Sequence, residues 1–194
     1  MSSSTYSETK ANFSAQNSEN CMFTFLLYFS GGDHVITGSK DHTIKVFNVS
    51  EGKGGVVTPS ANLEPPHYDG IESLALQNDV LFSASRDTCI KKWNLKNNEV
   101  VRSLNNAHKD WICGLCFLPG GHTVISGCRA GYIKLWSVET CNLVGEMKAH
   151  NSTINTITTN NTNVFTGSND GSIGIWRVRN NFDKSPDSEM SSSS

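Results

Sequence analysis

The stretch RDTCIKKWNL, residues 86–95, decides the fold, because related versions of it occur at three other places in the chain. They are KDHTIKVFNV at 40–49, RAGYIKLWSV at 129–138 and NDGSIGIWRV at 169–178. The aromatic residue at the eighth position is Phe47, Trp93, Trp136 and Trp176, with spacings of 46, 43 and 40 residues. A period of about forty residues indicates a repeat architecture.

Other residues keep the same register. An acid or its replacement stands six residues before each aromatic, and a hydroxyl residue stands four residues before that. A histidine opens three of the units and is followed four residues later by isoleucine. These positions are Asp41, Asp87, Ala130 and Asp170; Thr37, Ser83, Ser126 and Thr166; His67, His108 and His150; and Ile71, Ile112 and Ile154. The first unit has neither the histidine nor the tryptophan.

Each unit predicts four short strands. In the second unit they are expected at 71–76, 79–83, 89–93 and 99–104, with a turn at Gln77 and Asn78. Later units have turns at 119–121 and 160–162. Four strands in about forty residues is typical of a WD40 blade, so we expect an all-β, propeller-type fold.

The recurring polar residues predict a structural hydrogen-bond network. A tryptophan buried between blades needs an acceptor for its indole N–H. The hydroxyl, histidine and acid can continue the chain of hydrogen bonds and rigidify each blade. The predicted sets are His67, Ser83, Asp87 and Trp93; His108, Ser126 and Trp136; and His150, Thr166, Asp170 and Trp176. The third set lacks the acid, because Ala130 takes its place.

Three catalytic or ligand-binding hypotheses compete with this interpretation. A Ser/His/Asp set also occurs in hydrolases, but a triad would occur once, whereas this set repeats with a tryptophan in register. The stretch GSKDHTIKVF, residues 38–47, has an acid where a phosphate loop needs a hydroxyl. Cys113 and Cys116 are expected on opposite sides of a strand, as free thiols. We therefore expect no cofactor, no metal and no catalysis.

Beyond the general repeat pattern, several stretches of the sequence resemble one particular family. GSKDHTIKVFNV, EPPHYDGIESLAL, SRDTCIKKWNL, NAHKDWICGL, GCRAGYIKLWSVET and GEMKAHNSTINTI are similar to the tail propeller of kinesin-like motors of the fourth kinesin family, over residues 33–178. The resemblance implies a tail that binds microtubules or cargo. The chain contains no motor domain, so we expect no ATPase activity of its own. The rival hypothesis is a WD40 adaptor in a signalling or ubiquitin-ligase complex.

The resemblance implies seven blades, and the sequence offers about four: three full units and a partial first one. We expect a disordered segment at 1–20, a partial propeller at 21–179 with blades ending near 49, 95, 138 and 178, and a disordered Ser-rich tail at 180–194. The run CMFTFLLYF, 21–29, predicts a buried strand and not a signal peptide. An open arc with both end blades uncovered should self-associate through its edges.

A partner-binding face is predicted from the residues beside the turn acids. Lys40, Arg86 and Arg129 precede these acid positions, and Tyr68 and Trp111 follow the histidines. Arginine with exposed aromatics is typical of interaction hot spots, and a basic face suits an acidic partner such as tubulin. The net charge of −2 gives no basic field for nucleic acid, and no segment could span a membrane. We expect a cytoplasmic, cytoskeleton-associated protein.

Overall fold

The structure, a computed structural model, describes residues 23–29, 33–49 and 57–177, the first of these ranges for its backbone only. The regular elements within these ranges are all β-strands, which confirms the all-β prediction. None of the described residues forms a helix that could cross a membrane. The segments predicted to be disordered, 1–20 and 180–194, lie outside the described ranges.

The strands form four antiparallel sheets in chain order. Sheet 1 contains β1 (Phe23–Phe29), β2 (His34–Ser39), β3 (Ile44–Asn48) and β4 (Ala61–Asn62). Sheet 2 contains β5 (Ile71–Gln77), β6 (Val80–Ser85), β7 (Ile90–Asn94) and β8 (Glu99–Leu104). Sheet 3 contains β9 (Ile112–Phe117), β10 (Thr123–Cys128), β11 (Tyr132–Ser137) and β12 (Leu143–Lys148). Sheet 4 contains β13 (Ile154–Thr159), β14 (Asn163–Ser168) and β15 (Ile173–Arg177).

The division into units differs from the prediction at both ends. The first unit was expected to be partial, but sheet 1 has four strands, although β4 contains only two residues. Sheet 4 has three strands within the described ranges. The run 21–29 forms a strand over Phe23–Phe29, as predicted, whereas its expected burial concerns side chains outside the described part of the chain.

The turns follow the local sequence. Asn78, between β5 and β6, has a φ of 52°, and Gly120, between β9 and β10, has a φ of 89°, a region that asparagine and glycine enter at low cost. In each sheet the residue after the turn-acid position also has positive φ: 72° at His42, 66° at Thr88, 79° at Gly131 and 81° at Gly171. The same turn is therefore built four times.

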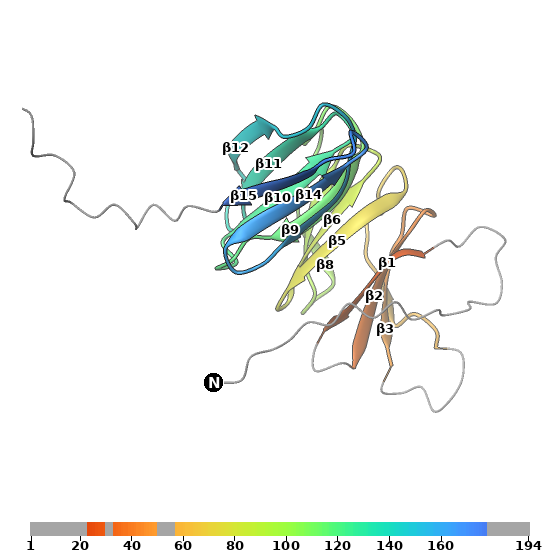
Figure 1. Cartoon of the computed structure of the whole chain (residues 1–194). Coiled ribbons are helices and arrows are strands. Elements are labelled where there is room, and N and C mark those ends of the chain that lie inside the picture. Colours follow the sequence, from red (N-terminus) through yellow and green to blue (C-terminus); the bar gives the residue numbers. More distant parts are fainter. Residues whose placement is uncertain (1–22, 30–32, 50–56, 178–194) are drawn as a thin grey trace, which may run out of the picture.

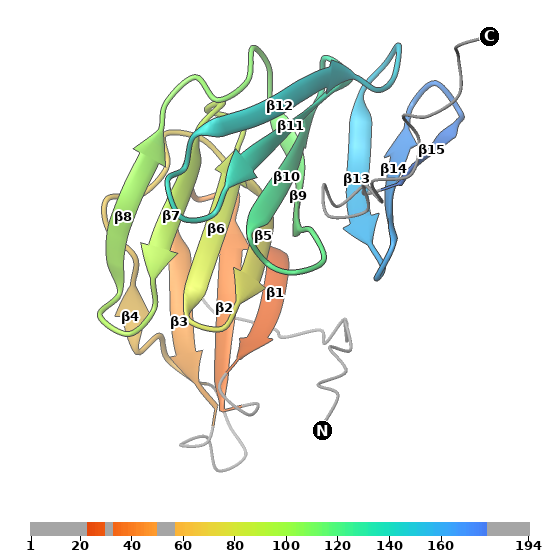
Figure 2. The same ribbon diagram turned by 90° about the vertical axis from the view of Figure 1, so that its left-hand side faces the viewer.

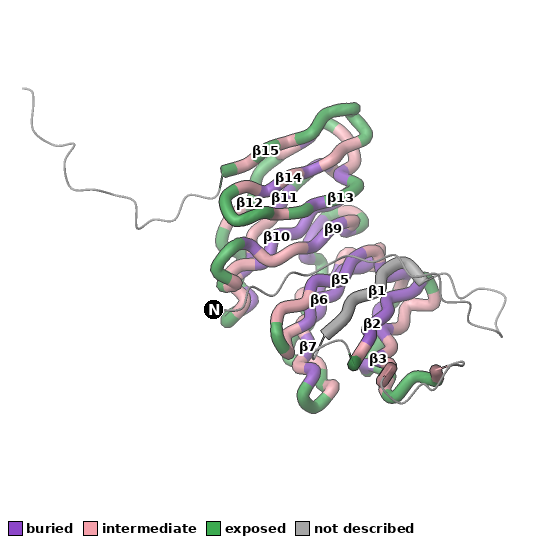
Figure 3. The backbone as a smooth tube through the Cα atoms, turned by 60° about the horizontal axis from the view of Figure 1, so that its bottom comes forward, coloured by how far each residue is buried: buried purple, intermediate pink, exposed green. Residues whose placement is uncertain are grey.

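The sheets follow one another like blades (Figures 1 and 2), and β1, β5, β9 and β13, the first strands of successive sheets, contact each other in that order. Figure 3 shows sheets 2 and 3 between sheet 1 and sheet 4, with the purple buried segments concentrated where sheets meet. This arrangement places equivalent turns of the four sheets at the same end of the molecule.

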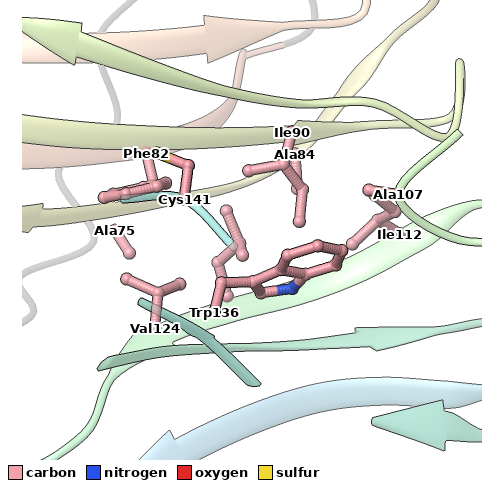
Figure 4. Packing of buried hydrophobic residues seen from close by; sticks show 10 residues of the cluster. Ala75, Phe82, Ala84, Ile90, Ala107, Ile112, Val124, Trp136 and Cys141 are labelled. Atoms are coloured by element: carbon pink, nitrogen blue, oxygen red, sulfur yellow. The ribbon is translucent and has the colours of Figure 1, made fainter. Parts of the chain in front are cut away.

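Three hydrophobic clusters fill the spaces between neighbouring sheets. Trp93 packs with Ile36 and Ile44 of sheet 1. Trp136 packs with Phe82 and Ile90 of sheet 2 (Figure 4). Trp176 packs against the cluster that contains residues of sheets 3 and 4. Each tryptophan therefore faces the preceding sheet, and the opposite faces of sheets 1, 2 and 3 are covered by the sheet that follows.

The two ends of the arc are not equally open. On sheet 4, Ile173 is 74% exposed, whereas the equivalent Ile44, Ile90 and Ile133 are 1%, 0% and 2% exposed. On sheet 1, Val35 and Thr37, which alternate with the inward-facing Ile36, are 3% and 4% exposed. The expectation that both end blades are uncovered is therefore right for sheet 4 and wrong for these positions of sheet 1.

Candidate functional site

The second sheet contains a complete hydrogen-bond chain. His67 lies with Nδ1 2.9 Å from Asp87 Oδ2 and with Nε2 2.8 Å from Ser83 Oγ. The indole N–H of Trp93 donates to the same Ser83 oxygen at 2.9 Å. A neutral His67 that donates from Nδ1 and accepts the Ser83 hydroxyl proton at Nε2 satisfies every bond in the chain.

The fourth sheet repeats this arrangement. His150 Nε2 lies 2.7 Å from Thr166 Oγ1, and His150 Nδ1 lies 3.1 Å from Asp170 Oδ2. Trp176 donates its indole N–H to Thr166 Oγ1 at 3.0 Å. The repeat of one geometry in two sheets, about eighty residues apart, is what a structural role requires.

The third and first sheets lack parts of the chain. His108 Nε2 lies 2.7 Å from Ser126 Oγ, which also accepts the Trp136 indole N–H at 2.8 Å. With Ala130 at the acid position, His108 Nδ1 is buried and has no hydrogen-bond partner among the described residues. Thr37 Oγ1 in sheet 1 is likewise buried without a partner in the described part of the chain.

Two residues of the network, Asp87 and His108, have strongly lowered pKa values. Burial alone would raise the pKa of Asp87, but hydrogen bonds from His67 and from the backbone N–H groups of Tyr68 and Cys89 lower it to about 2. Burial lowers the pKa of His108 to about 3, and the nearby Lys134 charge adds to the effect. Asp87 is therefore ionised and His108 neutral at pH 7.

The buried hydroxyls cannot act on a substrate. Ser83, Ser126 and Thr166 are each 0% exposed, and each is enclosed between an indole and an imidazole. A catalytic serine needs access to the substrate carbonyl. The geometry therefore supports the structural interpretation of the repeated Ser/His/Asp set.

The cysteines show no metal-binding arrangement. Cys89, Cys113, Cys116, Cys128 and Cys141 are free thiols, and the described residues contain no group of three or more His, Cys, Asp or Glu that could hold an ion. Burial raises the pKa of Cys113 to about 11 and that of Cys116 to about 12. Both thiols stay protonated and are poor ligands and nucleophiles at neutral pH.

The predicted partner residues come from equivalent turns, and three of them meet directly. Two guanidinium groups lie over the Trp111 ring, with Arg86 Cζ 4.6 Å and Arg129 Cζ 4.7 Å from its centroid. Arg86 comes from sheet 2 and Arg129 from sheet 3. Trp111 remains 37% exposed, so part of its ring is accessible to a partner. We call Arg86, Trp111 and Arg129 the arginine–tryptophan stack.

The repeat register explains where the stack forms. Trp111 stands three residues after His108, and its carbonyl accepts the Arg129 N–H at 2.8 Å. Gly70 stands three residues after His67, and its carbonyl accepts the Arg86 N–H at 3.0 Å. A Cβ on Gly70 would lie 3.4 Å from Lys40 Cα and 3.8 Å from Arg86 Cδ. This position therefore lies between the pre-acid residues of neighbouring sheets.

Lys40 and Tyr68 extend the same end of the molecule. Lys40 is exposed and lies beside Gly70, and the Tyr68 side chain is 87% exposed. The Tyr68 backbone N–H donates to Asp87 Oδ2 at 2.8 Å, so the network carboxylate anchors this loop. Lys91 also anchors this loop, because its Nζ donates hydrogen bonds to the carbonyl oxygens of Pro65, at 2.8 Å, and Pro66, at 2.7 Å.

Sequence reasoning missed the role of Glu72. Its carboxylate forms an ion pair with Arg86, and both side chains are largely covered, at 19% and 28% exposed. Arg86 is therefore neutralised within the fold. Arg129 makes no ion pair with any described residue and is exposed. Successive side chains of β5 point to opposite faces of the sheet, so Glu72 points away from its buried neighbour Ile71. This alternation is the only signal in the sequence that could have indicated the pairing.

Comparison with known proteins agrees with the repeat geometry. The sequence matches the WD domain, G-beta repeat, over residues 12–48, 98–137 and 141–177. The WD40 β-propeller domain of Doa1 superimposes with a TM-score of 0.71 at 21% identity, covering 81% of this chain and 51% of that one. The computationally designed Ika4 protein gives a TM-score of 0.72 at 25% identity, with 86% of this chain and 96% of that one covered.

Curated relatives are similar over most of the chain. The human kinesin-like protein KIF21A is 52% identical over 151 residues, 78% of this chain, and the mouse kinesin-like protein KIF21B is 51% identical over 144 residues, 74% of this chain. The kinesin-like protein klp-12 of Caenorhabditis elegans is 32% identical over 86% of the chain. The matched region is 9% of the length of the first two relatives and 11% of the third. The chain belongs to the WD40 repeat family, forms an incomplete β-propeller, and is similar in sequence to a WD40 region of kinesin-like proteins.

Proposed function

We propose that the chain is a non-catalytic protein-interaction scaffold that binds acidic partners through the arginine–tryptophan stack and the neighbouring Lys40 and Tyr68. The observation that carries the proposal is the partly exposed Trp111 ring in contact with both Arg86 and Arg129. A rigid aromatic flanked by guanidinium groups provides contact area at low entropic cost and is typical of binding hot spots. Backbone hydrogen bonds from Arg129 to Trp111 and from Arg86 to Gly70 fix these loops, so the stack is preorganised.

The charges of this face favour an acidic partner. Glu72 compensates Arg86, but no described residue forms an ion pair with Arg129. Arg129 can therefore take up a carboxylate in a charge-assisted, bidentate contact without first breaking an internal ion pair. Arg86, held by Glu72, also contacts the indole and keeps it in place. The two arginines thus have different roles, with Arg129 contacting the partner and Arg86 positioning Trp111.

Among acidic partners, the similarity to kinesin-like proteins favours tubulin or a motor cargo adaptor. Microtubule surfaces are strongly acidic, and electrostatic complementarity accelerates association with such a surface. In this proposal the chain is a cytoplasmic, cytoskeleton-associated protein. An adaptor in a signalling or ubiquitin-ligase complex would use the same fold, and no feature of the described residues favours it over the tubulin proposal.

Co-sedimentation with stabilised microtubules tests the proposal. We expect the wild-type chain to bind, and we expect Arg129→Glu to weaken binding about tenfold or more, because it replaces a charge-assisted contact by repulsion. The matched control is Arg102→Glu, which reverses an exposed arginine on the fourth strand of sheet 2, away from the stack. Binding should also weaken as salt is raised.

Two results would contradict the proposed binding surface, and a third would exclude tubulin as the partner. Equal losses for Arg129→Glu and Arg102→Glu would show only a dependence on net charge. Unchanged binding of Arg129→Glu together with Trp111→Ala would show that the partner contacts another surface. Failure of the wild-type chain to bind microtubules would remove tubulin as the partner, and the two variants could then be compared on acidic cargo proteins.

A further inference from the structure

The loop between β4 and β5 contains the run Pro65-Pro66-His67-Tyr68, in which exposed and buried side chains alternate in an unusual way. Tyr68 is 87% exposed, more than any other large hydrophobic side chain of the described residues, and both prolines are exposed. His67 is only 2% exposed, because its ring belongs to the hydrogen-bond chain of sheet 2. We call Pro65, Pro66 and Tyr68 the proline–tyrosine segment.

The backbone of this loop is held at several points. The buried Leu63 donates its N–H to the Ile44 carbonyl oxygen at 2.9 Å. Lys91 donates to the carbonyl oxygens of both prolines, and Asp87 accepts the Tyr68 N–H. The exposed side chains therefore stand on an ordered backbone, and a partner that binds them does not have to order the loop first.

The spacing of the exposed residues matches that of an extended proline ligand. A polyproline helix has three residues per turn, so residues three apart lie on the same side of it. Pro65 and Tyr68 have this separation, and His67 stands at a position that faces elsewhere. The fold uses His67 as its internal anchor and leaves the other three side chains to solvent.

The chemistry of these side chains identifies the surface that fits them. Proline rings lose no rotamer entropy on binding, and the aromatic-lined grooves of WW domains recognise them in extended segments. A tyrosine offers a large apolar ring and a hydroxyl that finds a hydrogen-bond partner when buried. We propose that the proline–tyrosine segment binds a WW-type domain, with the prolines in its aromatic groove and Tyr68 in a neighbouring pocket.

The charges beside the segment favour a groove bordered by basic side chains. Glu64 is exposed and Asp69 is half-buried, and neither forms an ion pair with a described residue. Lys91 is 4% exposed, with its Nζ held by the proline carbonyl oxygens. An acidic surface is therefore attracted to the exposed Arg129, whereas a WW domain with basic residues beside its groove is attracted to this loop.

This inference goes beyond the proposed function, because it assigns a second partner to a different set of side chains. Arg129 and Trp111 belong to turns of sheet 3, whereas the proline–tyrosine segment precedes sheet 2. The experiment below contains no tubulin. A negative result in it would leave the microtubule proposal standing, and a failure to bind microtubules would leave this inference standing.

Isothermal titration calorimetry of the whole chain, with a purified WW domain that binds Pro-Pro-x-Tyr peptides, tests the inference. We expect stoichiometric binding, with Tyr68→Ala and Pro66→Ala each raising the dissociation constant at least about tenfold. Both side chains are exposed, so circular dichroism and thermal melting should show the variants folded. The matched control is Tyr132→Ala, which removes an exposed tyrosine of β11 and should leave the dissociation constant unchanged.

A peptide of residues 63–70, titrated with the same WW domain, separates the motif from its presentation by the fold. We expect the folded chain to bind at least as tightly as the peptide, because its loop is already ordered. Binding of the peptide without binding of the chain would show that anchoring at His67 hides the segment, and would overturn the inference. So would a lack of binding by both, or equal binding by the wild type and Tyr68→Ala.

Discussion

Replacing Ala130 by aspartate should stabilise the protein, because it supplies the partner that His108 Nδ1 lacks among the described residues. In sheets 2 and 4 the acid at this position lies 2.9 Å and 3.1 Å from the histidine Nδ1. It also accepts the backbone N–H two residues later, at 2.9 Å in Cys89 and 3.0 Å in Ser172. An aspartate at 130 should therefore gain two hydrogen bonds at once.

The size of the effect follows from these bonds. A hydrogen bond to a charged group contributes about 1.5–3 kcal/mol, and we take the lower end because the turn is partly open to water. Lys148, whose Nζ lies 2.5 Å from the Ala130 carbonyl oxygen, favours a carboxylate nearby. We expect an increase of about 1–2 kcal/mol in the free energy of unfolding. For a domain of this size this corresponds to a rise in Tm of roughly 3–6 °C.

Thermal unfolding by calorimetry at pH 7 measures the gain, with Ala130→Asn as a control that has the same shape without the charge. The asparagine variant should show about half the gain. The gain of the aspartate variant depends on an ionised carboxylate whose pKa is lowered by folding. It should be fully present above the unfolded pKa near 3.9 and be lost as pH falls toward 2. An unchanged or lower Tm in a variant with native circular dichroism would refute the reasoning.

Three further stability predictions use the equivalent turns. Gly131→Ala should cost about 2–4 kcal/mol in urea unfolding, because the new Cβ would lie 2.2 Å from the His150 carbonyl oxygen at a φ of 79°. Gly171→Ala, at a φ of 81° with nothing within 4 Å, should cost only about 1 kcal/mol, and equal costs would contradict the close-approach argument. Thr88→Gly should add about 0.5–1 kcal/mol by relieving a β-branched residue at a φ of 66°, and a loss of stability would show that this turn is not strained. Asp87→Ala should lower the free energy of unfolding by about 1–2 kcal/mol at pH 7. It should also reduce the loss of stability between pH 4 and pH 2, because folding lowers the pKa of Asp87 to about 2. An unaltered acid transition would show that another group controls it.

The repeat could be predicted from the sequence because each unit carries several residues in fixed register. The tryptophan, the hydroxyl and the histidine stand at the same separations in sheets 2 and 4, and the structure places them in the same contacts. Sheet 1 was harder to predict, since Phe47 replaces the tryptophan and no histidine stands in register. Its fourth strand, Ala61–Asn62, is too short to produce an alternating pattern.

The arginine–tryptophan stack could be predicted only in part. Register placed Arg86, Arg129 and Trp111 at one end of the molecule, but not their stacking, because stacking depends on how far neighbouring sheets turn relative to each other. The pairing of Glu72 with Arg86 has the same cause, since it joins a strand residue to a turn residue fourteen positions away. The unequal exposure of the two ends of the arc also depends on packing that a one-dimensional pattern does not contain.

The most direct test of the account compares hydrogen exchange at the four tryptophan indoles, followed by NMR. Trp93, Trp136 and Trp176 donate their indole N–H groups to hydroxyls that are 0% exposed, whereas Trp111 is 37% exposed, contacts two arginines, and finds no acceptor for its indole N–H among the described residues. We expect three slowly exchanging indole protons and one fast one, with the fast signal lost in Trp111→Phe. Fast exchange at Trp93 or Trp136, or equal exchange at all four, would contradict both the repeated networks and the exposed stack.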